Sequence, residues 1–199
     1  MTLFFRLPIL LLLIFAYTFA ACDSNGTTQD GDDPSPPASN ALALTIVDNG
    51  EETLKTIEAY TYFSTTTDST GATAFSIFFT DEETFSESST ERGFFGSAVR
   101  MSPRPAVGAY AASSVEDGES FTNGQTFLIS FSEVSGPGSS IFYSVEGGDV
   151  DITRSESGRV DGDLFLQGRA ISFDGSTQSE QRITITGSFR ASSLGDFEV

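Results

Sequence analysis

The sequence contains no histidine, no tryptophan and a single cysteine, Cys22, among its 199 residues. Without histidine, Ser-His-Asp and Cys-His catalysis are excluded, and so are zinc sites of the usual kind. One cysteine cannot form a disulfide within the chain, so stability must come from the core. Neither a glycine-rich dinucleotide motif nor a P-loop is present. These absences argue against an enzyme.

Basic residues are scarce as well. Ten Lys and Arg stand against 28 Asp and Glu, and Lys55 is the one lysine. The net charge of −18 argues against nucleic acid and anionic membrane surfaces as partners. Such a balance suits a solvated surface in high salt. A more specific interpretation of this acidic excess is a surface patch that binds cations.

The N-terminal segment has the pattern of an export signal. Residues 1–21 carry one charge, Arg6, followed by an apolar run over 7–15. This run has signal-peptide length and is too short to span a membrane as a mature helix. No later segment is apolar enough to cross a membrane. We therefore predict that residues 1–21 direct the chain out of the cytoplasm and are removed.

The end of this segment, Phe-Ala-Ala-Cys at 19–22, resembles the lipobox of bacterial lipoproteins, although Phe19 stands where leucine is usual. The resemblance implies that Cys22 is lipidated, with acyl chains such as palmitate, and becomes the mature N-terminus. Two or more acyl chains give stable membrane anchoring. The alternative is ordinary signal-peptidase cleavage, with Cys22 incidental.

A tether and one domain follow. Residues 22–40 comprise the cysteine and a polar, acidic, proline-containing stretch without large apolar residues, which predicts a disordered tether. Such a stretch spans about 25 Å on average. Residues 41–199 suffice for a single domain, since a chain of about 150 residues buries roughly 68–70% of its unfolded surface.

From residue 41 onward, apolar and polar residues alternate in short runs between turn sequences, and no convincing amphipathic helix occurs. Clear examples are 74–80 and 126–131, which place Phe or Ile at every second position. About ten such runs predict an all-β, antiparallel β-sandwich of about 8–10 strands, with a closed or partly open β-barrel as the alternative.

Phenylalanine is abundant, with 19 residues, and should fill the core in the absence of tryptophan. The adjacent pairs Phe78-Phe79 and Phe94-Phe95 would point to opposite faces of a strand. Either both faces are covered or one ring of each pair is exposed.

The stretch 141–189 predicts a series of hairpins. Residues 141–146 and 149–154 form two strands, joined by Gly147-Gly148 in a type I′ turn. A third strand begins near Arg159, and pairing Ile152 with Val160 keeps its apolar residues on the core face. A bulge near Gly168 would then bring Ile171 and Phe173 to the core face too.

This register collects acidic residues on the outer face, with Asp151 opposite Asp161 and Asp149 opposite Asp163. Like charges directly opposite cost roughly 0.2–1 kcal/mol per pair. A hard cation such as Ca²⁺, which takes six to eight oxygen ligands, would offset that cost. The alternative is a solvated face without any cofactor. The candidate cation ligands are Glu146, Asp149, Asp151, Asp161 and Asp163.

Phe142 and Phe165 fall on the same outer face in this register. They are either covered by another part of the chain or exposed as a contact for a ligand or partner. Exposed aromatic rings on a polar face are typical of binding sites.

Four motifs lie between residues 108 and 189: Gly108-Ala109-Tyr110, Gly148-Asp149-Val150-Asp151-Ile152-Thr153, Gly158-Arg159-Val160-Asp161-Gly162 and Ile183-Thr184-Ile185-Thr186-Gly187-Ser188-Phe189. Together they resemble a recurrent module of small Gram-negative lipoproteins of unknown function. The resemblance covers less than half of the chain. The resemblance implies an all-β lipoprotein domain and identifies no catalytic residues.

Taken together, the sequence predicts a lipid-anchored envelope protein, on the periplasmic face or the outer surface of the outer membrane. Its expected role is structural or binding, with a protein or glycan partner. One alternative is a β-barrel that binds a glycan, lipid or small molecule through exposed aromatic rings. A further alternative is a hydrolase that uses two carboxylates.

Overall fold

The computed structural model describes residues 40–48, 51–85, 93–114, 124–136 and 138–198. The predicted signal peptide, Cys22 and the tether up to residue 39 lie outside these ranges. Within them, the chain has no helix with the length and hydropathy of a membrane span.

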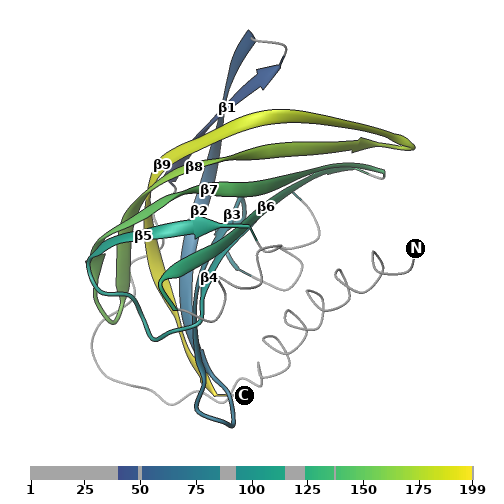
Figure 1. Cartoon of the computed structure of the whole chain (residues 1–199). Coiled ribbons are helices and arrows are strands. Elements are labelled where there is room, and N and C mark those ends of the chain that lie inside the picture. The colour runs from purple at the N-terminus through teal and green to yellow at the C-terminus, as the bar shows by residue number, and fades with distance from the viewer. Residues whose placement is uncertain (1–39, 49–50, 86–92, 115–123, 137, 199) are drawn as a thin grey trace.

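The described residues form nine β-strands and no helix, which confirms the all-β prediction (Figure 1). The strands are β1 (Asn40–Asp48), β2 (Glu51–Thr67), β3 (Thr73–Thr80), β4 (Gly93–Arg100), β5 (Gly108–Ser113), β6 (Thr126–Gly136), β7 (Ser139–Ser155), β8 (Arg159–Asp174) and β9 (Thr177–Glu198).

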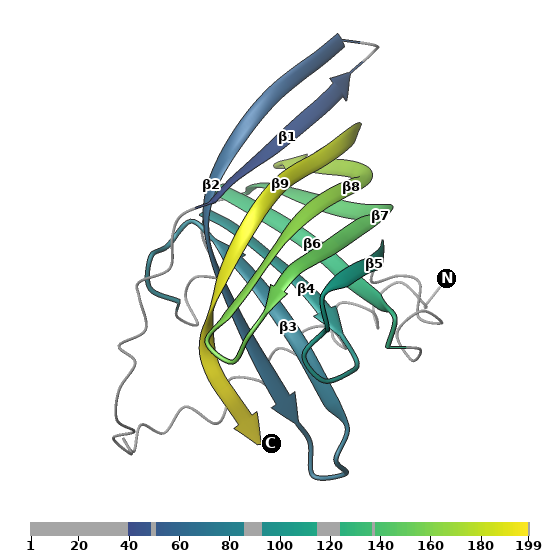
Figure 2. The same ribbon diagram turned by 90° about the vertical axis from the view of Figure 1, so that its left-hand side faces the viewer.

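All nine strands belong to one sheet that closes into a ring (Figure 2). Neighbouring strands follow the order β1-β2-β3-β4-β6-β5-β7-β8-β9, and β9 closes the ring by pairing with β1 and β2. Its first half pairs antiparallel with β1, and its second half pairs parallel with β2. The closed arrangement given as the alternative is therefore observed, in place of two stacked sheets.

The ring encloses a core of aromatic and aliphatic side chains. Phe131 is buried in this core, stacked on Phe94 with ring centroids 5.7 Å apart and tilted against Phe79 at 5.6 Å. Phe79 also meets Phe189 edge to face at 5.8 Å. Each buried ring contributes roughly 1.5–3 kcal/mol to stability. Phenylalanine therefore fills the core as predicted.

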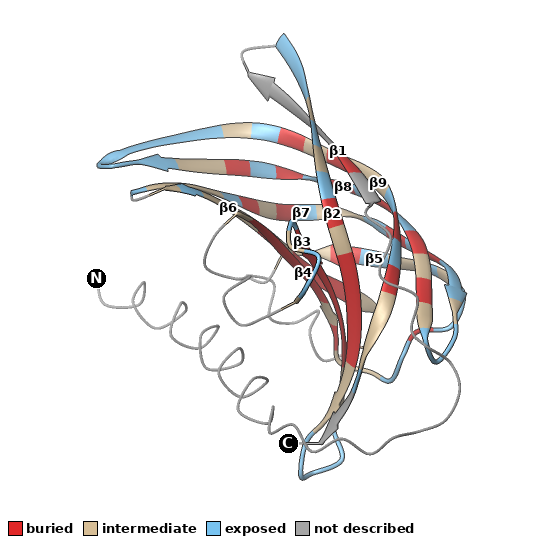
Figure 3. Cartoon of the chain, turned by 180° about the vertical axis from the view of Figure 1, so that it is seen from behind, coloured by how far each residue is buried: buried red, intermediate tan, exposed pale blue. Residues whose placement is uncertain are grey.

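The β2–β3–β4 wall is covered on its outer face too. Tyr62, Phe78 and Phe95 are buried there, and Phe85 from the β3–β4 connection packs over them, 5.1 Å from Phe78. Figure 3 shows β3 and β4 buried along most of their length. Both rings of each adjacent Phe pair are thus buried, which answers the question left open by the sequence.

The predicted hairpin at Gly147-Gly148 is wrong. β7 runs through this dipeptide without turning, and a bulge at Glu146 shifts its register against β8. A two-residue turn and a one-residue bulge both reverse which positions face inward, so the same apolar pattern fits either. Long-range pairing decides between them: β7 pairs with β6 before the bulge and with β5 after it.

The bulge predicted near Gly168 is also misplaced. β8 is continuous, and the extra residue lies across from Gly168 on β7. A Cβ at Gly168 would overlap the carbonyl oxygen of Ser144, so glycine permits this close approach. Ile171 and Phe173 consequently remain on the outer face, where Ile171 is half-buried and Phe173 exposed.

The predicted register of the third strand needs correction as well. Val160 pairs with Ser155, and Ile152 pairs with Gly162, because a second bulge occurs at Thr153. The inward side of β8 is nevertheless as predicted, with Val160, Leu164 and Leu166 buried. The turn predicted at Asp174-Gly175 joins β8 to β9, and Gly175 has a φ of 58°.

We expect Gly96→Ala to destabilise the domain by about 1–3 kcal/mol, because a Cβ at Gly96 would overlap the Phe131 ring in a filled core. Gly158→Ala is the matched control, since its Cβ would meet no atom within 4 Å. It should change the free energy of unfolding by less than about 0.5 kcal/mol. Urea denaturation measures both, and equal effects would contradict this account of the core.

Candidate functional site

The outer face of β7–β9 carries the acidic residues singled out by the sequence, and two of them, Glu146 and Asp161, form ion pairs with arginines. Arg169 on β8 bridges Glu146 and Glu180, with Nη1 2.9 Å from Glu180 Oε1. The hydrogen bond to Glu180 and, next, the charge of Glu146 raise the pKa of Arg169. Glu146 is therefore an ion-pair partner in this structure.

Asp161 is the centre of a second arginine group. The Nε and Nη2 of Arg159 each donate a hydrogen bond of 2.7 Å to its carboxylate, which raises the pKa of Arg159. Arg154, directly across on β7, lies 3.7 Å away, and Arg190 on β9 lies 4.0 Å away. Opposite charges on neighbouring strands stabilise a sheet, in contrast to the repulsion that the sequence predicted here.

The remaining acidic residues are not gathered either. Asp151 lies opposite Asp163, not Asp161, and Asp149 lies opposite Phe165, so the predicted cross-strand pairs are wrong. Asp163 accepts a hydrogen bond of 2.6 Å from Ser188. In the described part of the chain, no group of three or more His, Cys, Asp or Glu is placed to hold a metal ion. The sequence analysis did not anticipate the arginine pairs, although Arg159 lies two positions from Asp161 on the same strand, where strand alternation could have found it.

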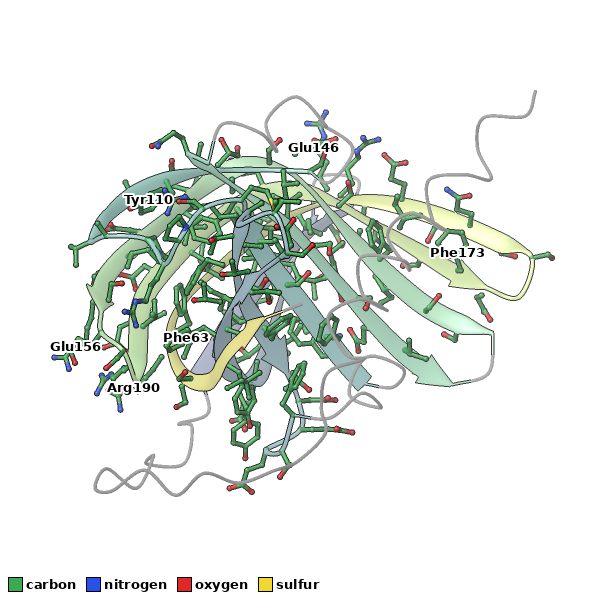
Figure 4. All side chains as sticks on the ribbon, turned by 90° about the horizontal axis from the view of Figure 1, so that it is seen from below. Phe63, Tyr110, Glu146, Glu156, Phe173 and Arg190 are labelled. Atoms are coloured by element: carbon green, nitrogen blue, oxygen red, sulfur yellow. The ribbon has the colours of Figure 1, made fainter. Side chains whose placement is uncertain are left out.

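Large apolar side chains are exposed on the same outer face. Phe142, Phe165 and Phe173 are 39%, 49% and 41% exposed. Phe142 lies directly opposite Ile171, which precedes Phe173 by two positions, so these three share one patch. Phe165 lies further along β8. Figure 4 shows Phe173 at one end of the molecule and Glu156 and Arg190 at the other.

The interior holds a polar group that sequence reasoning missed. Tyr143 Oη donates a hydrogen bond of 2.9 Å to Glu133 Oε2, and Lys55 Nζ binds the same oxygen. The three side chains come from β7, β6 and β2, and β2 is not a neighbour of the other two. Burial and then the charge of Glu133 raise the pKa of Tyr143. We call these three residues the Glu133 cluster.

Strand alternation could have found this cluster. Glu133 continues the inward series of Phe127, Ile129 and Phe131, and Lys55 shares the inward side of β2 with Ile57. Local pattern places both side chains inward but does not say that they meet, since 78 residues separate them.

A second interior group lies at the end of β4. Arg100 is only 7% exposed, and its guanidinium lies over the Tyr110 ring, 4.6 Å from the centroid. Its Nε donates to the carbonyl oxygen of Gly124. Tyr110 in turn meets Phe127 edge to face. Among the described residues, no carboxylate forms an ion pair with Arg100.

The raised pKa of Tyr143 predicts a pH dependence. Its ordinary pKa near 10 applies to the unfolded chain, so its stabilising contribution is complete below pH 10 and is lost as pH rises above that value. The free energy of unfolding should fall there by up to about 1.4 kcal/mol per pH unit for this one proton. Tyr143→Phe should make the fall shallower in urea denaturation between pH 8 and 11. An unchanged slope would contradict the assignment.

No protein family, curated protein or solved structure matches the chain. The resemblance to lipoprotein modules therefore rests on the sequence motifs alone, and the function must be argued from the geometry.

Proposed function

We propose that this chain is an exported, lipid-anchored protein of the cell envelope that acts as a structural or binding module and not as an enzyme. The observation that carries the proposal is the filled interior of the ring. Phe79, Phe94 and Phe131 belong to the buried apolar core, and ionisable groups reach the inward side in the Glu133 cluster and at Arg100. A packed centre favours surface binding over chemistry inside the ring.

The hydrolase alternative is less well supported. Glycoside hydrolysis needs two carboxyl groups about 5–9.5 Å apart, facing a cleft. Glu133, which points inward, already accepts hydrogen bonds from Lys55 and Tyr143. Such a carboxylate is held in place by its neighbours, which suits a brace between strands better than proton transfer to a substrate.

The anchoring part of the proposal draws on the sequence. Cys22 follows two alanines and a signal-like segment, and β1 begins only at Asn40. Acyl chains on Cys22 would hold the domain at the membrane by hydrophobic insertion. They would also overcome the repulsion between anionic headgroups and a chain of charge −18.

A second candidate function is the binding of a small acidic molecule at Arg100. The observation in its favour is a nearly buried guanidinium, stacked on Tyr110, without a carboxylate partner among the described residues. Buried charges are normally paired, and a guanidinium fits a carboxylate well. This function corresponds to the small-molecule-binding alternative raised from the sequence.

The lipid anchor is tested by expressing the full chain and Cys22→Ser in a Gram-negative host. We expect the unaltered protein in the membrane fraction, with a diacylglyceryl group on its N-terminal cysteine by mass spectrometry. Cys22→Ser should lack the acyl mass and leave the membrane fraction. Recovery of the unaltered protein in the soluble fraction with an unmodified N-terminus would overturn the anchoring proposal.

The Arg100 function is tested by thermal melting of the protein with benzoate and hexanoate as probes. Ligand that binds the folded state raises the midpoint, by the equivalent of about 2.7 kcal/mol at 100 times Kd. We expect the rise to vanish in Arg100→Met and to persist in Arg104→Met, because Arg104 is an exposed arginine nearby. Equal responses of the two variants would refute the assignment.

A further inference from the structure

The outer face of β7–β9 differs from the rest of the molecule in composition. We define this face by the five arginines Arg154, Arg159, Arg169, Arg182 and Arg190, the six acidic residues Glu146, Asp149, Asp151, Asp161, Asp163 and Glu180, and the apolar residues Phe142, Phe165, Ile171 and Phe173. It holds more than half of the arginines of the chain and three of the five exposed large hydrophobic residues of the described part. Arginine and aromatic residues are enriched in protein interfaces.

The face is almost neutral within a strongly acidic protein. Five arginines against six acidic residues leave a charge of −1, while the whole chain carries −18. Many of these charges already form ion pairs within the face, through Arg169 and Asp161. Two molecules of this protein repel each other overall, but contact through these faces brings little additional like charge together.

The size of the face also suits a second copy. β8 has 16 residues, which at about 3.3 Å per residue gives a length of roughly 50 Å. Three strands about 4.8 Å apart, with their side chains, give a width of about 15 Å. The product, roughly 750 Å², is close to the ~800 Å² that each partner contributes to an interface of standard size.

We propose that the outer face of β7–β9 is a self-association surface, through which two copies of this chain form a two-fold symmetric dimer. In such a dimer the same patch is used by both partners, so it must be self-complementary. The presence of charges of both signs is compatible with that condition, and the exposed rings of Phe142, Phe165 and Phe173 supply apolar area. The inference does not depend on the lipid anchor, although anchoring would raise the local concentration of copies.

The test is sedimentation velocity of the full chain in detergent over a range of concentrations. We expect a monomer–dimer equilibrium that the triple variant F142S/F165S/F173S weakens by about 100-fold or more, since three exposed aromatic rings are removed from the surface. The matched control is L54S/V107S. Leu54 and Val107 are 68% and 65% exposed but lie elsewhere, so non-specific association would respond to this control at least as strongly.

Salt provides an independent readout. Added salt shortens the Debye length, from about 10 Å at 0.1 M to about 3 Å at 1 M, and so reduces the repulsion between acidic copies. The dimer should therefore become tighter as salt increases. A protein that stays monomeric up to about 100 µM in high salt would overturn the proposal, because repulsion no longer opposes contact there. Equal weakening by the control variant, or a glycan or other protein bound to a face that does not dimerise, would also overturn it.

Discussion

The return of β9 to the beginning of the domain is the constraint on which the rest of the structure depends. β9 pairs with β8 along one side and with β1 and then β2 along the other. Closure gives every strand an inner and an outer side and pairs most of the described strand residues on both edges, although residues 51–59 of β2 pair with β1 alone. The inner side is filled by aromatic rings without a disulfide, which is consistent with a chain that has one cysteine.

Closure also determines where charge is tolerated. The packed centre of the ring excludes ionised groups, whose burial without partners is costly. The inward side of the strands carries Lys55, Glu133 and Arg100 only near strand ends, where a partner or solvent is within reach. These groups can therefore brace the ring or meet a ligand, whereas the centre supplies stability.

The outer face of β7–β9 shows the same principle on the surface. Two of the predicted carboxylates, Glu146 and Asp161, are paired with arginines, while Asp151 still lies opposite Asp163, and the face as a whole carries little net charge. What remains exposed is an unusual combination of phenylalanine rings and paired charges. This combination supports the proposed self-association through this face, while the remaining acidic surface favours repulsion between copies.

Alternation of apolar and polar residues was enough to predict an all-β domain, the Phe-filled core and the inward residues of β3 and β6, because a strand's side-chain period is a local property. Local pattern could not distinguish a turn from a bulge at Gly147-Gly148, since both shift that period equally. The meeting of Lys55 with Glu133, and of Arg154 with Asp161, depends on which strands become neighbours. Only the closed tertiary structure determines the Lys55–Glu133 pair, because 78 residues separate the two side chains. The Arg154–Asp161 pair is set by the register of β7 against β8, which depends on a bulge at Thr153 that the apolar pattern did not reveal.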